Sequence, residues 1–234
     1  MIYIINQPRG IGDILFIEPI LRHLYNNGEN QIILPVAPEY MWIKEYINYV
    51  EFPSMNNFHI NYEKFDAGII NDDQHYIPMR FAMPIVRGLA PHDYSDMYHT
   101  MLDKYRLLNL DIDLWKTLRW KRNFTKENEL FNQIIKTNNY ILVNTNFSGG
   151  NINLTLNQDK EIINMNNIPG YSLLDWAKII ENASEIHTVS TSILFMIETL
   201  SIKATEVHIY NRTPIDKNLD GIREFVNKNF ILHE

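Results

Sequence analysis

The sequence of 234 residues predicts an α/β fold made of two Rossmann-like halves, residues 1–124 and 125–234, that face each other. Three observations lead to this prediction. Short apolar segments alternate with helix-patterned segments, which is typical of parallel, doubly wound sheets. The alternation stops near residue 77 and begins again near residue 140, so it forms two separate series. A composition with 45% hydrophobic and 21% charged residues can bury a substantial core, which argues against a disordered chain.

The first series contains three predicted strands and two predicted helices. Each strand is a short apolar run, and each helix has apolar residues at helical spacing. The strands are Ile2–Ile5, 31–36 and 67–70, and the helices are 14–26 and 40–49. Asn27 and Gly28 end the first helix, because both residues accept the left-handed backbone that often follows one. A helical, polar and aromatic stretch follows from residue 77 to about residue 109.

The second series follows an amphipathic helix predicted at residues 126–136. Its predicted strands are 140–145, 161–165, Glu185–Val189 and Glu206–Tyr210. Its predicted helices are 173–182, 193–200 and 220–229, and the last precedes an apolar end at residues 230–232. Strands that alternate with helices indicate a second parallel sheet.

The turn after the first strand is the strongest candidate for a binding site. It contains Arg9, Gly10, Gly12 and Asp13, and a helix-patterned segment follows at once. In open α/β sheets, ligands bind beyond the carboxyl ends of the strands. Glycines there let backbone N–H groups approach a ligand, and a helix N-terminus favours anionic groups. Asp13 at the first position of the helix has a second interpretation, because aspartate is also a good N-cap.

The segment from Gly12 to Leu24 resembles the opening of the heptosyltransferase-like glycosyltransferases, which have the GT-B architecture. Their pattern is Gly-Asp, two apolar residues, a proline and then Leu-Arg-x-Leu. The matching residues here are Gly12, Asp13, Pro19, Leu21, Arg22 and Leu24. The resemblance implies that Asp13 lies at the acceptor site and acts as general base, beside Arg9, Gly10 and Gly12.

A second resemblance covers residues 172–200 and implies a nucleotide-sugar site in the second half. In the same families a helix ending in alanine leads to a strand, and a serine-bearing turn then opens the next helix. Ser190, Thr191 and Ser192 form such a turn here and could hold a pyrophosphate, or could only cap the helix. Glu198 could accept hydrogen bonds from a ribose, although a solvated helix carboxylate is the commoner case. The turn lacks the glycine and histidine of the heptosyltransferase pattern Asp-Ser-Gly-x-x-His, so the resemblance extends to the superfamily and not to heptose donors.

Further candidates follow predicted strands. Carboxylates and an imidazole that follow residues 67–70 could bind acceptor hydroxyls. They are poor candidates for a metal site, because adjacent side chains of an extended chain point to opposite faces. Beyond residues 140–145 and 206–210, polar residues could contact the donor, or could be an ordinary turn and a surface arginine. The acceptor candidates are Asp72, Asp73 and His75, and the donor candidates are Asn146, Ser148, Gly149, Tyr210 and Arg212. His187 lies in a strand pattern, so we expect a hydrogen-bonded core histidine.

Composition excludes several classes of function. The absence of cysteine excludes disulfides, thiolate catalysis and cysteine zinc sites. A formal net charge of −7 argues against non-specific binding to nucleic acid, although Arg80 with Arg87, and Arg119 with Arg122, could form a local basic pocket. The start lacks the pattern of a signal peptide, and no apolar run would span a bilayer, so we expect a soluble, cytoplasmic protein without a membrane span.

Two motifs for other cofactors are incomplete. Gly10 and Gly12 lack the third glycine of the NAD fingerprint. Asp111 and Asp113 form an Asp-x-Asp, which in GT-A glycosyltransferases holds a metal ion after a buried strand. A helical pattern precedes it here, so we interpret it as a helix end and a turn. We therefore expect no metal and no cofactor, with a nucleotide sugar as co-substrate.

The sequence therefore predicts an inverting, metal-independent glycosyltransferase that uses a nucleotide-sugar donor and a hydroxyl acceptor, most simply a carbohydrate. Asp13 would remove the proton of the acceptor hydroxyl. Two alternatives keep the fold. One is a non-catalytic protein that binds nucleotides or nucleotide sugars, and the other is a nucleotide-sugar epimerase or hydrolase.

Overall fold

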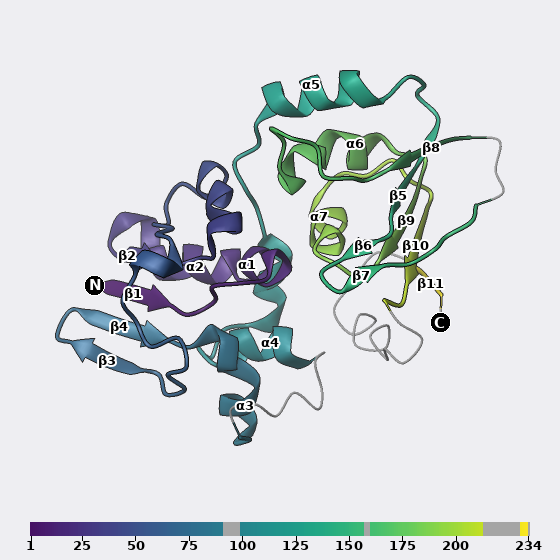
Figure 1. Cartoon of the computed structure of the whole chain (residues 1–234). Helices are drawn as coiled ribbons and strands as arrows, with labels where there is room; N and C mark the ends of the chain where they lie inside the picture. The colour runs from purple at the N-terminus through teal and green to yellow at the C-terminus, as the bar shows by residue number, and fades with distance from the viewer. Residues whose placement is uncertain (91–98, 157–159, 213–229, 234) are drawn as a thin grey trace. The chain divides into compact units, whose positions relative to one another are not determined.

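A computed structural model describes residues 1–90, 99–156, 160–212 and 230–233 (Figure 1). The chain divides into two compact units, Met1–Lys121 (unit 1) and Arg122–Glu234 (unit 2). This division lies beside the boundary expected between residues 124 and 125. Each unit is a mixed α/β structure with parallel strands, which confirms the predicted fold class at this level.

Unit 1 is built on a sheet with the strand order β2-β1-β4-β3. Strand β1 is parallel to both of its neighbours, β2 and β4. The strands are β1 (Ile2–Ile5), β2 (Gln31–Ile33), β3 (Gly68–Asn71) and β4 (Gln74–Ile77). The apolar runs at the sequence positions of β1 and β2 gave these two strands correctly, although the second is shorter than the predicted 31–36.

The third predicted strand of unit 1 differs from the expectation. Strand β3 is antiparallel to β4 at the edge of the sheet, and its residues Ile69 and Ile70 are exposed. The second neighbour of β1 is β4, which was not predicted, because its sequence Gln-His-Tyr-Ile contains no apolar run. Asn71 helps to make the hairpin turn by accepting a hydrogen bond from the Asp73 backbone N–H at 3.2 Å.

The helices of unit 1 are shorter than predicted. Pro19 divides the expected helix 14–26 into α1 (Ile11–Phe16) and α2 (Glu18–Tyr25), because proline has no N–H to continue the hydrogen-bond ladder. The left-handed Asn26 ends α2, next to the predicted stop. The expected helix 40–49 is a 3₁₀ helix, η2 (Pro38–Glu45). The others are η1 (Asn26–Gly28), η3 (Met55–Asn57), η4 (Met79–Phe81), α3 (Ala82–Arg87), α4 (His99–Arg106) and η5 (Ile112–Thr117).

The sheet of unit 2 is entirely parallel among its described strands, with the order β11-β10-β9-β5-β8. The strands are β5 (Tyr140–Asn144), β8 (Glu161–Asn164), β9 (Glu185–Val189), β10 (Glu206–Tyr210) and β11 (Ile231–His233). In chain order this is the 2-1-3-4-5 arrangement of flavodoxin-like sheets. The two central strands β5 and β9 are buried along their whole length.

The helices of unit 2 match the predicted positions closely. They are α5 (Phe124–Ile134), η6 (Leu173–Trp176), α6 (Ala177–Asn182) and α7 (Ile193–Thr199), and α5 packs beside α6 (Figure 1). The predicted helix 220–229 lies outside the described residues. The expected loop at residues 146–151 is a small hairpin made of β6 (Asn146–Phe147) and β7 (Gly150–Asn151).

The Asp-x-Asp motif has a structural role. Asp111 is the N-cap of η5, and its side chain accepts a hydrogen bond from the Asp113 backbone N–H at 2.9 Å. The preceding element is helix α4, so the prediction of a helix end followed by a turn is confirmed. Asp113 is also paired with Lys116, at 2.8 Å between Oδ1 and Nζ.

Candidate functional site

Strand order identifies one position for a ligand in each unit. In an open parallel sheet, ligands bind beyond the carboxyl ends of two neighbouring strands whose connections run in opposite directions. This point lies between β1 and β4 in unit 1, and between β5 and β9 in unit 2. Polar side chains gather at both points, and we describe each cluster by itself.

In unit 1 the turn from β1 to α1 is shaped by Gly10. Its φ of 84° lies in the left-handed region that favours glycine, and a Cβ there would lie 2.5 Å from Asp13 Oδ2. Gly10 is the N-cap of α1, so Asp13 lies in the first turn of the helix, with Gly12 before it. The expectation that Asp13 occupies the first helical position or caps the helix is therefore wrong, because the left-handed turn starts the helix two residues earlier.

Asp13 forms an ion pair with a buried lysine of α4. The distance from Asp13 Oδ1 to Lys104 Nζ is 3.1 Å, and the Asp13 side chain is 37% exposed whereas that of Lys104 is 1% exposed. Lys104 also donates to Gln7 Oε1 and, at 3.4 Å, to the carbonyl of Met79. A buried ammonium therefore holds one carboxylate oxygen of a side chain that solvent still reaches. Sequence reasoning missed Lys104, because it looks like an ordinary solvated lysine of a helix.

The residue after β1, Asn6, makes a second set of hydrogen bonds at this end of the sheet. Its Nδ2 donates to Tyr76 Oη at 2.6 Å and to the Tyr62 carbonyl at 2.9 Å. Its Oδ1 is buried and has no hydrogen-bond partner within the described part of the chain. Burial raises the pKa of the Tyr76 phenol, although the hydrogen bond from Asn6 opposes this shift, so the hydroxyl stays protonated at neutral pH. Asn6 and Tyr76 thus form a neutral, hydrogen-bonded pair near the carboxyl ends of β1 and β4.

We expect the substitution Gly10→Ala to disturb this turn. The added Cβ would collide with the Asp13 carboxylate, and alanine is strained at a φ of 84°. The expected result is a loss of about 1–3 kcal/mol in the free energy of unfolding, measured by urea denaturation. The control is Gly68→Ala, since no atom lies within 4 Å of a Cβ there and Gly68 has no positive φ. Equal effects of the two substitutions would contradict the role of Gly10.

The other acceptor candidates are not brought to Asp13. Asp72 and Asp73 lie in the exposed β3–β4 hairpin, and the Asp73 carbonyl accepts from the Ile2 backbone N–H at 2.8 Å. They are therefore at the amino end of β1, whereas Asp13 follows its carboxyl end. His75 lies within β4, with its ring centroid 5.5 Å from that of Tyr3. The side chain of Arg9 is exposed, and its carbonyl accepts from Gln7 Nε2 at 2.8 Å.

In unit 2 the cluster is centred on Asn144 at the end of β5. Asn144 Nδ2 donates to Thr188 Oγ1 at 3.0 Å and to Thr191 Oγ1 at 3.1 Å, which links β5 to the turn after β9. Arg212 Nε donates to the carbonyl of Ser190, so this guanidinium lies at the same turn. Ser192 makes no side-chain capping bond at the start of α7. The structure thus brings Ser190, Thr191 and Arg212 together, and Asn144 joins them although it was not singled out.

Five other donor candidates have separate surroundings. Asn146 donates through Nδ2 to the Met165 carbonyl at 3.1 Å, and Ser148 and Gly149 are exposed in the turn of the β6–β7 hairpin. Glu198 is half-buried in the last turn of α7. Tyr210 contacts His187 Nδ1 through its hydroxyl at 2.8 Å, so it belongs to a histidine cluster on the sheet face.

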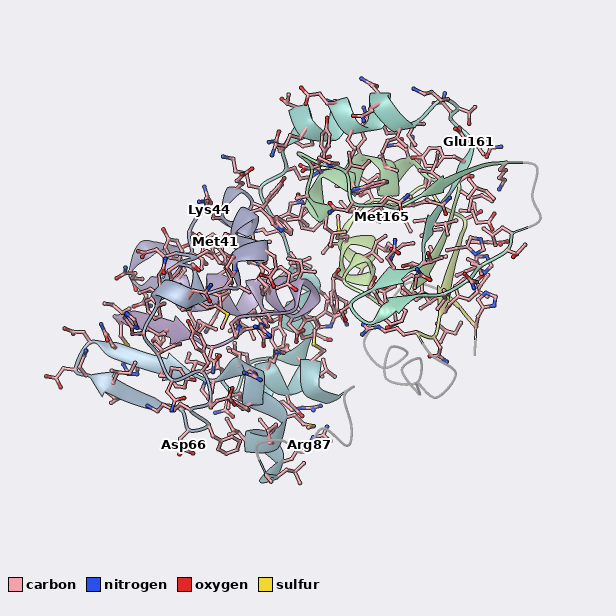
Figure 2. The ribbon with its side chains drawn as sticks, viewed as in Figure 1. Met41, Lys44, Asp66, Arg87, Glu161 and Met165 are labelled. Carbon is pink, nitrogen blue, oxygen red and sulfur yellow. The ribbon has the colours of Figure 1, made fainter. Side chains whose placement is uncertain are left out.

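Three of the four arginines that could have formed an anion pocket, Arg80, Arg87 and Arg122, are paired with carboxylates. Arg87, at the end of α3 in Figure 2, lies 3.0 Å from Asp103 Oδ2 through its Nε. Arg122 binds Glu127 and Glu181 together, and these hydrogen bonds raise the pKa of its guanidinium despite its partial burial. Arg87 and Arg122 therefore hold helices to their neighbours in each unit rather than presenting free charge.

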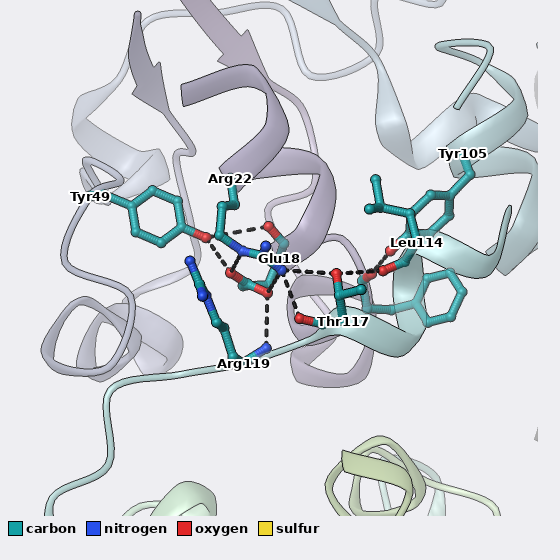
Figure 3. Close-up of polar contacts among 8 residues, drawn as sticks. Glu18, Arg22, Tyr49, Tyr105, Leu114, Thr117 and Arg119 are labelled. Atoms are coloured by element: carbon teal, nitrogen blue, oxygen red, sulfur yellow. Dashed lines mark hydrogen bonds and ion pairs between the residues drawn. The ribbon is translucent and has the colours of Figure 1, made fainter. Parts of the chain in front are cut away.

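Unit 1 also contains a buried carboxylate that sequence reasoning missed. Glu18 in α2 has a fully buried side chain that accepts from Arg22 Nε at 3.0 Å, from Tyr49 Oη at 2.5 Å and from the Arg119 backbone N–H at 3.0 Å (Figure 3). Arg22 also donates a hydrogen bond through Nη2 to the Thr117 carbonyl at 2.7 Å. Burial, and then the charge of Glu18, raise the pKa of Tyr49 well above its ordinary value. The network fixes residues 117–119 against α2, so Arg22 of the Leu-Arg-x-Leu pattern has a structural role.

Comparison with known proteins tests the expected resemblance. No protein-family model matches the chain, and no curated protein is similar to it in sequence. The iron-containing dodecameric glycosyltransferase TibC from enterotoxigenic E. coli H10407 aligns with 89% of this chain, at a TM-score of 0.50 and 8% sequence identity. The fold resembles that of this glycosyltransferase. The chain spans 57% of the length of TibC.

A second solved structure also aligns with the chain at low sequence identity. The E. coli heptosyltransferase WaaC, solved with ADP-2-deoxy-2-fluoro heptose, aligns over 100% of this chain and 93% of its own, with a TM-score of 0.46 and 11% identity. The resemblance to glycosyltransferases that the sequence indicated is confirmed as a likeness of fold by the match to TibC. Across the described residues, every helix is too short or too polar to cross a bilayer.

Proposed function

We propose that the chain is a glycosyltransferase that moves a sugar from a nucleotide-sugar donor to an acceptor hydroxyl by metal-independent, inverting displacement. The observation that carries the proposal is the Asp13 carboxylate. It follows the carboxyl end of β1 at the strand-order reversal, is partly exposed, and is oriented by the buried Lys104. A carboxylate fixed at this position of an α/β sheet is suited to act as a general base on a bound hydroxyl.

The proposed reaction is a single displacement. Asp13 takes the proton of the acceptor hydroxyl as that oxygen forms a bond to the anomeric carbon of the donor. The bond from this carbon to the diphosphate oxygen breaks, and the nucleoside diphosphate leaves with the bonding electron pair. Negative charge develops on the leaving diphosphate, and a guanidinium with hydroxyl donors can stabilise it. In unit 2, Ser190 and Thr191 after β9 and Arg212 after β10 are groups of this kind.

A thermal-shift screen with nucleotide sugars tests the donor half of the proposal. We expect one nucleotide sugar, at about 100 times its Kd, to stabilise the protein by about 2.7 kcal/mol, and to do so in the presence of EDTA. NAD serves as the negative control. The substitution Arg212→Gln should weaken this binding about 10- to 100-fold, because a charged hydrogen bond to the diphosphate is lost. Lys136→Gln, at an exposed lysine of the same unit, should leave it unchanged. A response that requires a divalent metal would contradict metal-independent binding of the donor.

The second candidate is a protein that binds nucleotide sugars without transferring them. The ion pair of Asp13 with Lys104 favours it, because the carboxylate already has a partner. This candidate predicts stabilisation by a nucleotide sugar without transfer or release of sugar. An epimerase or hydrolase, the other alternative, would isomerise or release the sugar with no acceptor present. Product analysis by NMR separates the three outcomes.

A further inference from the structure

Two Glu-x-His segments lie side by side on the sheet of unit 2. Glu185 and His187 are in β9, and Glu206 and His208 are in the neighbouring strand β10. The parallel register pairs Glu206 with Glu185 and His208 with His187. Because side chains alternate along a strand, all four point to the same face of the sheet. This face is distinct from the cluster at the end of β9, since Glu185 begins the strand.

Three of these side chains converge on one point. One oxygen or nitrogen atom from each of Glu185, His187 and His208 lies within 4.8 Å of the others. Glu185 Oε1 is 2.6 Å from His187 Nε2 and 3.7 Å from His208 Nε2. The side chains are 9%, 4% and 13% exposed, respectively. Lys160 contacts the other oxygen of Glu185, Oε2, at 3.3 Å and leaves Oε1 to the imidazoles.

The other ring nitrogen of each imidazole, Nδ1, contacts the side chain of a further aromatic residue. His187 Nδ1 lies 2.8 Å from Tyr210 Oη, and His208 Nδ1 lies 2.9 Å from Nε2 of His233 in β11. The rings of His187 and His208 are stacked, with centroids 4.2 Å apart and 3° between their planes. A histidine that ligates a metal through one nitrogen is usually oriented by a hydrogen bond at the other, which is the arrangement here.

We propose that Glu185, His187 and His208 bind a divalent transition-metal ion of the Zn²⁺ type. Zn²⁺ takes imidazole nitrogen and carboxylate oxygen at about 2.0–2.2 Å, so tetrahedral ligand atoms lie about 3.4 Å apart. Rotation of the two imidazoles out of their stacked arrangement would bring the three ligand atoms to that separation. Glu206, whose Oε2 is 3.2 Å from His208 Nε2, or a water completes the fourth position. When His187 Nε2 binds the ion, its proton moves to Nδ1, where Tyr210 Oη accepts it in a hydrogen bond.

The site would fasten β9 to β10 and is independent of the proposed transferase chemistry. It also revises the expectation that the chain holds no metal. That expectation rested on the absence of cysteine and on acid clusters elsewhere, and it treated His187 alone. His187 is indeed a buried, hydrogen-bonded histidine, but the register with β10 gives it a partner that sequence spacing did not show.

Metal binding to the full chain tests the proposal. The protein is stripped with EDTA, and Zn²⁺ is then titrated by calorimetry with the bound metal counted by mass spectrometry. We expect one Zn²⁺ per chain with a Kd in the micromolar range or below, and a rise in Tm of about 5–10 °C at 100 times Kd. Co²⁺ in the same site should show the intense visible absorption of four-coordinate cobalt. Mg²⁺ should not bind, since it prefers oxygen ligands.

Substitutions locate the site, and a check that each variant is folded separates loss of metal binding from misfolding. His208→Gln and Glu185→Gln should each weaken Zn²⁺ binding at least 10-fold and abolish the Co²⁺ absorption, while His75→Gln in unit 1 should change neither. The Tm of each stripped variant shows that it is folded, and His208 is the safer position because it is the more exposed. Absence of stoichiometric Zn²⁺ in the unmodified chain, or binding that survives both substitutions, would overturn the proposal.

Discussion

The substitution Asp13→Asn should lower kcat/KM for sugar transfer by about 10²–10⁴, which is the usual contribution of a general base. Asparagine keeps the size of the side chain and an oxygen that can accept from Lys104, but it cannot take the proton of an acceptor hydroxyl. The fold should survive, because the side chain is 37% exposed and the hydrogen bond is retained. Initial rates with the donor found by the thermal-shift screen, together with the Tm of the variant, provide the measurement.

Two further variants make this result specific. Asp111→Asn should leave the rate unchanged, since Asp111 caps η5 and does not lie at the carboxyl end of a strand. Lys104→Met tests positioning, and it should lower kcat more than it changes KM. Transfer by Asp13→Asn at more than a tenth of the original rate would eliminate Asp13 as the base, even if donor binding is as expected.

Local sequence patterns were sufficient to predict most of the helices and strands. The strands β1, β9 and β10 have the predicted bounds, because β1 is an apolar run and β9 and β10 each carry β-branched residues at alternate positions. The turn at Gly10 could also be recognised from a local pattern, because a glycine-bearing segment after a strand indicates a position where ligands bind. Thr191 and Arg212 could be placed near one another because both follow neighbouring parallel strands.

Contacts between residues that are far apart in the sequence could not be predicted from local patterns. Strand β4 joins β1 although its Gln-His-Tyr-Ile sequence has no apolar run, and β3 is exposed although its sequence is apolar. Lys104 reaches Gln7 across most of unit 1, and no periodicity marks it as buried. The match of the two Glu-x-His segments depends on the register of β9 and β10, which is a property of the folded sheet.

The second large effect concerns stability and follows from Glu18. Its carboxylate is fully buried and serves three donors, namely Arg22, Tyr49 and the Arg119 backbone N–H. The substitution Glu18→Ala would leave the Arg119 backbone N–H without its acceptor and Arg22 without its counter-charge, and Tyr49 would keep only the Glu18 backbone carbonyl, at 3.3 Å. Removing one member of a buried charged pair costs about 3–5 kcal/mol, so we expect the Tm of unit 1 to fall by roughly 10 °C or more.

An exposed ion pair of the same unit provides the matched control. Glu63 pairs with Arg80 at 3.2 Å between Oε1 and Nη1, but its side chain is 63% exposed. Solvent screens such a pair, and Glu63→Ala should therefore cost about 0–1 kcal/mol. Calorimetric unfolding of both variants measures the difference. If Glu18→Ala were no more damaging than Glu63→Ala, residues 117–119 would have to be held by the contacts of η5, such as those of the buried Trp115, rather than by this carboxylate. The position of the Leu-Arg-x-Leu pattern next to Glu18 would then have no explanation in stability, and a role for Arg22 in binding would have to be tested instead.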